Sequence, residues 1–305
     1  MPRPRICVLG GTGFVGRHLA ARLALQDLDV KILTRLRARH RELLVLPGVS
    51  LVDANVHDPE TLKHEFAGCD AVVNLVGILN ERGHRGRVFD QVHVELVGKI
   101  LAACVSAGVP RLLHMSALNA AVDAPSHYLR SKGEAAALVL KAQDSLHVTV
   151  FEPSVIFGPG DSFINRFAAL LRMAPGVFPL ACPRARFAPV YVGDVAEVFV
   201  RSLDERTSFG QRYSLCGPKV YTLRELLRYT ARVMRWHRAI IGLPRSLSWM
   251  QAALMEWIPG KPFSLDNYRS LKLDSVCTEN GFGHFRIEPV SLETVVPAYL
   301  GKVTP

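Results

Sequence analysis

A glycine-rich turn near the start of the chain limits the possible folds more than any other feature. The turn Gly10-Gly11-Thr12-Gly13-Phe14-Val15-Gly16 follows a short apolar run at residues 5–9 and opens a helical pattern at residues 16–26. Three glycines at this spacing allow a tight turn, a close approach of pyrophosphate to the backbone and close packing of helix on strand. The helix start then presents free N–H groups to an anion. The turn therefore predicts a dinucleotide phosphate site formed by Gly10, Thr12, Gly13, Phe14, Val15 and Gly16.

Short apolar runs alternate with helical patterns throughout the first half of the chain. Buried strands are predicted at residues 5–9, 29–33, 49–53, 71–75, 111–115 and 148–152. The clearest helical patterns lie at residues 16–26, 92–107 and 128–142. This alternation is typical of an α/β protein of the Rossmann type, in which helices cover both faces of a doubly wound parallel sheet.

The second half of the chain is less regular. Proline and glycine recur between residues 153 and 183, which indicates loops. A strand at 190–192, a helix at 195–203 and a strand at 212–215 follow, and helical patterns dominate from residue 222. We expect a dinucleotide-binding core over residues 1–160. Residues 161–305 are expected to complete the sheet and to form a small, mainly helical region for substrate or interface contacts.

Composition narrows the classes of partner. The 305 residues carry a formal net charge of +10, and 49% of them are hydrophobic, so the chain is globular with a basic surface. Nucleic acid, anionic lipid or a phosphorylated ligand would each match this charge, as would a basic surface without a partner. The chain shows neither a zinc finger nor an aromatic RNA-binding strand, so no nucleic-acid partner is expected. No His/Cys cluster has ligand spacing, so no metal site is expected.

The cysteines suggest a reducing compartment. They lie at positions 7, 69, 104, 182, 216 and 277, form no C-x-x-C pair and mostly occupy apolar runs, so buried free thiols are expected. No apolar run approaches the ~20 residues that cross a bilayer, and the N-terminus lacks the apolar core of a signal peptide. A cytoplasmic protein is expected, with peripheral attachment to the inner face of the membrane as an open alternative.

The end of the second predicted strand bears on the choice of dinucleotide. NAD-binding proteins place an acidic residue there, against the ribose hydroxyls. This chain has Thr34-Arg35 instead, followed by Arg37 and Arg39. An arginine fork can bind a 2′-phosphate. Thr34, Arg35 and Arg39 are therefore assigned to the cofactor site, NADP(H) is preferred and NAD(H) remains an alternative. A solvated basic loop is the other interpretation of these arginines.

Together these motifs resemble the extended and atypical short-chain dehydrogenases/reductases over nearly the whole chain. Residues 52–58 are similar to the family's adenine-side loop, in which relatives have Asp at the position of Asn55. Residues 74–77 resemble the loop along the cofactor, 153–160 the segment near nicotinamide, and 189–196 a late family motif. The resemblance adds these residues to the cofactor site: Asn55, Val56, Leu75, Val76, Gly77, Pro153, Val155 and Ile156.

A narrower resemblance is to the subgroup that contains the dehydrogenase-like accessory subunit of respiratory complex I and its bacterial relatives. It rests on residues 92–95, 114–118, 128–132, 259–262 and 266–268. The resemblance implies NADP(H) binding and a link to respiratory electron transport or quinone metabolism, with a quinone-related substrate or a respiratory complex as partner. Met1 and the absence of a transit peptide favour a bacterial relative. Two alternatives stay open: a non-catalytic NADP(H)-binding accessory or assembly protein, and a nucleotide-sugar epimerase or reductase.

The resemblance also implies a catalytic group. Family members use a Tyr as acid/base, a Lys four residues later that lowers the pKa of this Tyr and binds the nicotinamide ribose, and a hydroxyl residue that orients the substrate. Tyr128 and Lys132 share a helix face and fit this pattern. Ser116 is the hydroxyl candidate, and all three also belong to the cofactor site. His93 is assigned to that site as well, with a packed helix residue as the other interpretation.

Two features of the sequence weaken the catalytic interpretation. Ser116 matches the middle hydroxyl at the end of the fifth strand, which leaves Ala117 where relatives carry the catalytic one. Ser126 is a substitute if its loop folds inward. A second pair, Tyr268 and Lys272, has the same spacing but lies beyond the sheet, and it is expected to be structural. The sequence therefore favours an oxidoreductase or an epimerase-like enzyme. A protein that binds NADP(H) without catalysis stays an alternative.

Three further expectations concern the second half. In residues 243–258, Leu247, Met250, Leu254 and Trp257 share one helical face, which is expected to pack on the core. Docking on a membrane or on a respiratory complex, helped by Arg235, Arg238 and Arg245, is the alternative.

Two single residues also carry expectations. Asp194 is expected to cap a helix. Arg166 is expected either to face a substrate anion or to be solvated.

Overall fold

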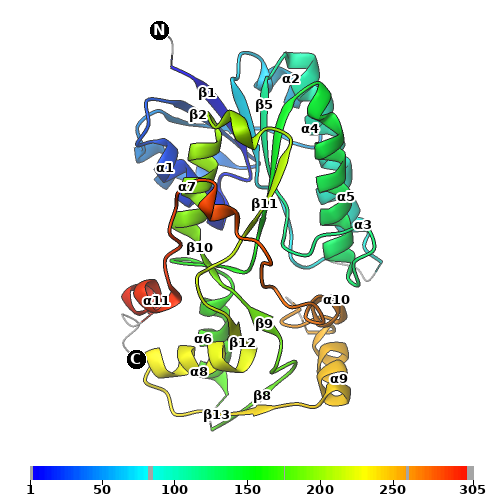
Figure 1. The fold of residues 1–305 in the computed structure, drawn as a ribbon, viewed down its shortest axis with the longest axis vertical. Helices are drawn as coiled ribbons and strands as arrows, with labels where there is room; N and C mark the ends of the chain where they lie inside the picture. Colours follow the sequence, from blue (N-terminus) through cyan, green and yellow to red (C-terminus); the bar gives the residue numbers. More distant parts are fainter. Residues whose placement is uncertain (1–2, 82–84, 175, 259–260, 301–305) are drawn as a thin grey trace.

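The computed structural model describes residues 3–81, 85–174, 176–258 and 261–300. Met1, Pro259 and Gly260 lie outside these ranges. The central strands are β1 (Arg5–Leu9), β2 (Asp29–Thr34), β3 (Val49–Asp53), β4 (Ala71–Asn74), β5 (Arg111–Met115), β6 (His147–Pro153) and β11 (Gln211–Leu215). They form one parallel sheet in the order β11-β6-β5-β4-β1-β2-β3. The predicted α/β class with a doubly wound parallel sheet is confirmed (Figure 1).

The register of the sheet places a crevice beside β1. Leu9 at the end of β1 pairs with Leu33 of β2 on one side and with Asn74 of β4 on the other. The chain winds outward from β1 to β3 and then, from β4, in the opposite direction. Loops that leave the carboxyl ends of β1 and β4 therefore diverge, and ligands of doubly wound sheets bind in the crevice between them.

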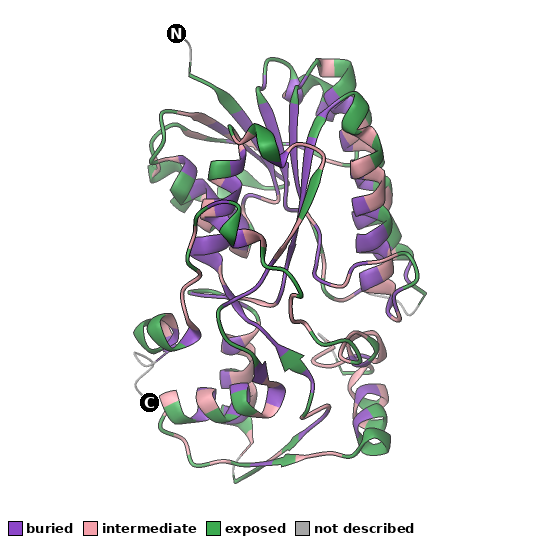
Figure 2. Cartoon of the chain, viewed as in Figure 1, coloured by how far each residue is buried: buried purple, intermediate pink, exposed green. Residues whose placement is uncertain are grey.

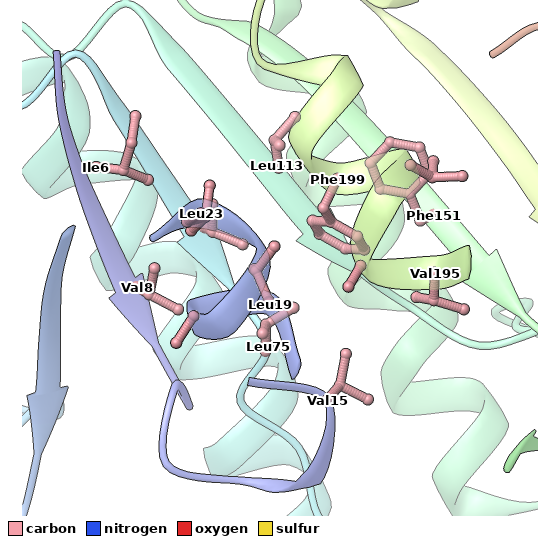
Figure 3. Packing of buried hydrophobic residues seen from close by; sticks show 14 of the residues in the cluster. Ile6, Val8, Val15, Leu19, Leu23, Leu75, Leu113, Phe151, Val195 and Phe199 are labelled. Atoms are coloured by element: carbon pink, nitrogen blue, oxygen red, sulfur yellow. The ribbon is translucent and has the colours of Figure 1, made fainter. Parts of the chain in front are cut away.

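Two helical layers bury the sheet because its side chains alternate between its faces. Ile6 and Val8 face the layer of α1 (Phe14–Leu23) and α7 (Val192–Ser202), and Figure 3 shows them in this core with Leu19 and Phe199. Cys7 and Leu9 face the other layer, which is formed by α2 (Pro59–Phe66), α4 (Leu96–Ala107) and α5 (His127–Lys141). Figure 2 shows the strands buried beneath both layers.

A smaller region at the other end of the molecule has its own core. Its helices are α6 (Ile164–Met173), α8 (Leu223–Val233), α9 (Arg245–Met255), α10 (Leu265–Ser270) and α11 (Leu292–Leu300). Its short strands pair as β7 (Ile156–Phe157) with β10 (Val190–Tyr191), β9 (Arg186–Phe187) with β12 (Tyr221–Thr222), and β8 (Val177–Leu180) with β13 (Ala239–Gly242). Leu171, Leu226 and Ile240 lie in this core. The expected helical C-terminal region is therefore present (Figure 1).

The prediction that Asp194 caps a helix is wrong. Helix α7 begins at Val192, with Tyr191 as its N-cap, so Asp194 lies inside the first turn. Its carboxylate instead accepts a hydrogen bond of 2.7 Å from the backbone N–H of Val290. The apolar residues before Asp194 continue the helical face, which is why the helix starts earlier than the sequence suggested.

The expectation of six free thiols is also wrong, because Cys216 and Cys277 form a disulfide. Cys216 follows β11, and the returning chain is held beside it by Asn280, whose side chain bonds both the N–H and the carbonyl of Cys216. The two cysteines lie 61 positions apart in the chain, and this separation conceals the contact from a sequence pattern. Cys7, Cys69 and Cys104 are buried free thiols, and Cys182 is a half-buried one.

Helix α9 does not pack as the sequence predicted. Ser248 and Ala252 are its buried residues, whereas Leu247, Met250 and Leu254 are exposed. Only the two small residues lie close enough to the rest of the region to be buried, so the large apolar side chains point outward. Within the described part of the chain, no helix combines the length and apolarity needed to cross a membrane.

Candidate cofactor-binding site

The glycine turn lies at the crevice, and two of its glycines are required by close contacts. Gly10 has φ +76, and a Cβ there would lie 2.9 Å from the carbonyl carbon of Leu75. A Cβ on Gly16 would collide with the backbone of Gly10 and Gly11. The turn can therefore lie against the β4 loop, and α1 against the turn, only because side chains are absent. Leu75, Val76 and the glycine turn are thus brought together at the point where the winding of the sheet reverses.

Gly13 has the geometry of an open phosphate cradle. It is the N-cap of α1, its N–H donates to the carbonyl of Gly10 at 3.0 Å, and no side chain caps the helix. Apart from the atoms of its chain neighbours, the described atom that a Cβ on Gly13 would meet within 4 Å is the carbonyl oxygen of Gly10, at 3.2 Å. The first N–H groups of α1, at Phe14 and Val15, have no intrahelical acceptor. This end of the helix therefore fits a pyrophosphate. Thr12 lies in the same turn, where its carbonyl accepts from Arg17 Nε at 2.9 Å.

The arginines after β2 differ in their partners. Arg37 is held by Asp53 at the end of β3, through its backbone N–H at 2.7 Å and through its guanidinium Nε at 3.7 Å. Arg35 and Arg39 are exposed and form no ion pair with any described residue. Thr34, the last residue of β2, is buried. Two of the three arginines are therefore available to an anion on the adenosine side.

The adenine-side loop follows β3. Asn55 is exposed, and its side-chain oxygen accepts from the N–H of His57 at 3.1 Å. This bond closes a short turn of the kind that Asn forms with the backbone two residues ahead. Val56 is half-buried beside it. Both residues lie on the same edge of the sheet as Thr34, because the parallel register pairs Thr34 with Asp53.

Lys132 is the central residue at the other end of the crevice. Its side chain is almost fully buried, and its Nζ donates to the carbonyl of Met115 at 3.0 Å. A Cβ on Gly77 would lie 3.1 Å from Nζ, so the glycine leaves the amine room beside the β4 loop. Burial lowers the pKa of Lys132 to about 8. No described carboxylate pairs with this amine, which is an unusual position for a cation.

Tyr128 lies one helical turn before Lys132 on α5. Its ring packs edge-on against Phe89 and His93, at centroid distances of 5.9 and 5.8 Å. Burial raises the pKa of Tyr128 to about 12. Lys132 is expected from the family resemblance to lower this pKa, whereas in this structure burial raises it. The phenol is therefore protonated at neutral pH.

His93 connects the β4 loop to α5. Its Nε2 accepts from the N–H of Ile78 at 3.2 Å, so Nδ1 carries the proton and donates to Ser131 Oγ at 2.8 Å. Ser131 in turn donates to the carbonyl of Tyr128 at 3.0 Å. Burial, together with Lys132 and His114, lowers the pKa of His93 to about 2. This histidine is thus neutral, fully buried and fixed within the π-helical turn Asp90–Glu95.

The serines near Tyr128 are engaged elsewhere. Ser116 Oγ donates to the carbonyl of Lys132 at 3.2 Å, which fixes α5 to the end of β5. Ser126 caps α5 through Leu129 N–H and accepts from Ser270 Oγ at 2.8 Å. The loop of Ser126 therefore does not offer this hydroxyl to a substrate. Ala117 is buried and supplies no hydroxyl.

The remaining predicted residues lie around this end of the site. The carbonyl of Pro153, at the end of β6, accepts from Leu118 N–H at 3.0 Å, so this end of the strand lies next to the β5 loop. Val155 and Ile156 follow β6, and the carbonyl of Val155 accepts from Val190 N–H at 3.0 Å. Tyr268 and Lys272 lie apart on and just after α10, where the amine stands 5.5 Å from the ring.

Sequence reasoning missed Asp266 as part of the site. Its carboxylate accepts from the N–H of His127 at 2.7 Å and from that of Tyr128 at 3.1 Å, so α10 caps the helix that carries Tyr128 and Lys132. A cavity of about 120 Å³ lies beside this contact, between Phe89, His127, Lys261 and Asp266. Arg166 borders the same segment, where it donates to the carbonyl of Lys261 at 3.0 Å. The one sign of this contact in the sequence is the resemblance of residues 266–268 to relatives. That resemblance does not indicate which residues Asp266 contacts.

Comparison with known proteins agrees with this geometry. The sequence profile of the NAD dependent epimerase/dehydratase family matches residues 6–216. Alpha subcomplex subunit 9 of mitochondrial NADH dehydrogenase [ubiquinone] 1 is 31% identical in Arabidopsis thaliana, over 88% of this chain and 68% of that protein. The same subunit of Mus musculus is 29% identical, over 86% of this chain and 67% of that protein. A ceramide reductase of Caulobacter vibrioides is 27% identical, over 78% and 73%. The chain thus spans about two thirds of the length of the two mitochondrial relatives.

Solved structures show the same fold at lower identity. A dTDP-glucose 4,6-dehydratase of Streptomyces venezuelae, DesIV, solved with NAD bound, superposes with a TM-score of 0.75. It is 20% identical, and the match covers 97% of this chain and 95% of that one. A UDP-N-acetylglucosamine 4-epimerase of Methanobrevibacter ruminantium superposes with a TM-score of 0.74 at 16% identity, over 99% and 97% of the two chains. The likeness extends through the C-terminal region as well as the sheet.

Proposed function

Because the chain belongs to the NAD dependent epimerase/dehydratase family, we propose that it is an NADP(H)-dependent oxidoreductase linked to respiratory electron transport or quinone metabolism. Nicotinamide dinucleotide binding of the short-chain dehydrogenase type follows from the family. The NADP(H) preference, the redox activity and the respiratory link are the proposal. The observation that carries the redox activity is Lys132, a cation buried without a carboxylate partner beside Tyr128 and Gly77.

The proposed preference for NADP(H) rests on the arginines after β2. Arg37 is already paired with Asp53, whereas Arg35 and Arg39 are exposed without a described ion-pair partner. A 2′-phosphate carries two negative charges to this edge, where the acid that would bind a ribose hydroxyl is replaced by Thr34-Arg35.

In the proposed reaction, the start of α1 and Lys132 bind the dinucleotide, and Tyr128 transfers a proton. The N–H groups at the start of α1 hold the pyrophosphate, and Lys132 holds the nicotinamide ribose. The bound nicotinamide supplies or accepts a hydride. Tyr128 is protonated at neutral pH because burial raises its pKa to about 12, so it donates a proton to a substrate carbonyl oxygen. Lys132, one turn further along α5, would stabilise the phenolate that remains.

The names of two relatives agree with this proposal in different ways. One is called a ceramide reductase, which agrees with a reductive direction. The other is called a subunit of NADH dehydrogenase [ubiquinone] 1, which agrees with a respiratory setting. The proposals of a quinone-related substrate and of a respiratory partner rest on these names and on the sequence resemblance.

A specific observation favours a second candidate, a protein that holds NADP(H) without turning it over. Ala117 stands where an orienting hydroxyl is expected, and Ser116 and Ser126 both serve the backbone of α5. Loss of one such donor lowers turnover roughly a hundred- to a thousand-fold in other enzymes. In this candidate the bound dinucleotide has a structural role within a respiratory assembly.

The two candidates are separated by Tyr128→Phe, which removes the hydroxyl and keeps the ring contacts with Phe89 and His93. We expect cells with this variant to show altered quinone levels and lower respiratory activity although the protein is folded and loaded with cofactor. Gly13→Val, which blocks the phosphate cradle, should give the same defect. Normal respiration in Tyr128→Phe, with a defect in Gly13→Val, would reject the enzyme and support the holding role.

A further inference from the structure

Helix α9 presents the apolar side that a helix ordinarily buries. Its buried residues, Ser248 and Ala252, are among its smallest, and Ser248 anchors it by accepting from Cys182 N–H at 3.1 Å. Trp249 is 53% exposed and Leu254 65% exposed, and Trp257, just after the helix, is 83% exposed. Large apolar side chains gathered in this way on one helix mark an interaction surface.

The β8–β13 ribbon extends this apolar side. Alternation along the two strands places Val177 and Pro179 on the same outward face as Ala239 and Ile241, which are their partners in register. Gln251 of α9 donates to the carbonyl of Pro179 at 3.2 Å, so helix and ribbon are continuous. The distal apolar surface is defined here by Val177, Pro179, Ala239, Ile241, Leu247, Trp249, Met250, Leu254, Trp257 and Ile258. It lies at the end of the molecule far from the seven-stranded sheet (Figure 1).

Residues 228–258 supply most of this surface, and all but one of the Asp, Glu, Lys and Arg residues in this segment are arginines. Arginines at positions 228, 232, 235 and 245 are exposed, and Arg238 is half-buried. Glu256 is the single acidic residue between positions 228 and 258, and its side chain is only 12% exposed. Arg172 adds a further exposed cation at the end of α6. The segment that supplies most of the distal apolar surface is therefore positively charged and complements an anionic partner.

We propose that the distal apolar surface docks on a bilayer that contains anionic lipids. The apolar side chains project from a helix and a ribbon, and tryptophans and arginines accompany them, which is the combination found where proteins lie in the membrane interface. Each arginine near an anionic lipid surface adds attraction that falls off within a Debye length. The proposal concerns attachment and does not depend on the reaction proposed above.

The test is co-flotation of the full chain with vesicles of phosphatidylcholine alone or with about 30% phosphatidylglycerol, at low and high salt. We expect binding to the anionic vesicles, weaker binding to the neutral ones, and loss of binding at high salt. The variant Trp249→Ser/Leu254→Ser should lower the partition coefficient at least about tenfold, because two exposed apolar side chains lose their burial in lipid. Its control is Leu25→Ser/Val45→Ser, which changes two exposed apolar residues beside the sheet and should bind as the wild type does.

A second variant tests the charge separately. Arg235→Gln/Arg245→Gln should weaken binding to anionic vesicles roughly tenfold and leave binding to neutral vesicles unchanged. Lys141→Gln/Arg206→Gln, which removes two cations elsewhere on the surface, is the matched control. Melting curves verify that all four variants are folded. Failure of the wild type to bind anionic vesicles would overturn the proposal, as would equal binding by all variants. Self-association that the Trp249/Leu254 variant abolishes, without vesicle binding, would assign the surface to a second copy of the chain instead.

Discussion

At the scale of single residues, burial and contacts between distant segments decide the state of the groups around Lys132. The glycines at positions 10 and 16 could be predicted, because a side chain at either position would collide with nearby backbone. The pKa of Tyr128 could not be predicted from its four-residue spacing to Lys132, since burial by Phe89 and His93 decides it. The bonds of Ser116 and Ser126 depend on the placement of α5 and α10, which the sequence does not give.

Lys132 provides the first prediction. Its amine has a lower pKa in the folded chain than in the unfolded chain, so the unfolded state binds more protons and stability rises as the pH increases from about 8 towards 10.5. At pH 7 the buried cation destabilises the fold. Lys132→Met should therefore raise the free energy of unfolding by about 1–3 kcal/mol and weaken NADPH binding at least about tenfold.

Urea unfolding of the wild type and Lys132→Met at pH 7 and pH 9.5 measures both effects. The stability advantage of the variant should shrink at the higher pH. An advantage that stays constant with pH, or a variant less stable than the wild type at pH 7, would contradict the assignment of a buried charged amine.

Arg35 provides the second prediction. Arg35→Ala should weaken NADPH binding by about 1–3 kcal/mol, as expected for a charge-assisted hydrogen bond, and leave NADH binding nearly unchanged. Arg206→Ala, an exposed arginine elsewhere, should change neither. Titration calorimetry measures the affinity of each protein for both dinucleotides. An equal loss of affinity for NADH in Arg35→Ala would show that Arg35 does not face a 2′-phosphate.

At the scale of helices and strands, local patterns predicted the sheet well and the C-terminal region poorly. The predicted limits of β1, β3 and β5 agree with the structure, because buried parallel strands are short apolar runs between turns. Helix α9 was misjudged, since a helical apolar pattern does not tell whether the apolar face packs on the chain's own core. The disulfide between Cys216 and Cys277 was missed for a similar reason: contacts between distant segments leave no local periodicity.

The turn before α1 provides the third prediction. Gly13→Val should abolish measurable NADPH binding, because its side chain occupies the path of the pyrophosphate, while the melting temperature stays close to that of the wild type. Gly98→Val on α4, where a Cβ would meet nothing within 4 Å, is the matched control. Retained NADPH affinity in a folded Gly13→Val protein would place the phosphates elsewhere.

At the scale of the whole molecule, the C-terminal region completes the site that the sheet begins. Asp266 bonds the first turn of α5, and Lys261 and Glu256 line the cavity beside it. Trp257 and Ile258 of the distal apolar surface are close in the chain to Glu256 and Lys261, which line the cavity. No sequence pattern within the first 160 residues contains this arrangement.

Asp266 provides the fourth prediction. Asp266→Ala should lower the free energy of unfolding by about 1–2 kcal/mol, since two backbone N–H groups at the start of a helix lose a charged acceptor. Amide exchange at the start of α5 should quicken more than elsewhere. Asp123→Ala, an exposed acid in the loop before α5, should have little effect, and matching exchange rates in the two variants would show that Asp266 does not hold this helix.

The central claim is that this chain holds NADP(H) in the crevice between β1 and β4. The most direct measurement is a calorimetric titration of the purified wild-type protein with NADPH and, separately, with NADH. We predict one site per chain and at least about tenfold tighter binding of NADPH, from the charge-assisted bonds of Arg35 and Arg39 to the additional phosphate. Equal affinity for the two dinucleotides, or binding of neither, would contradict the account.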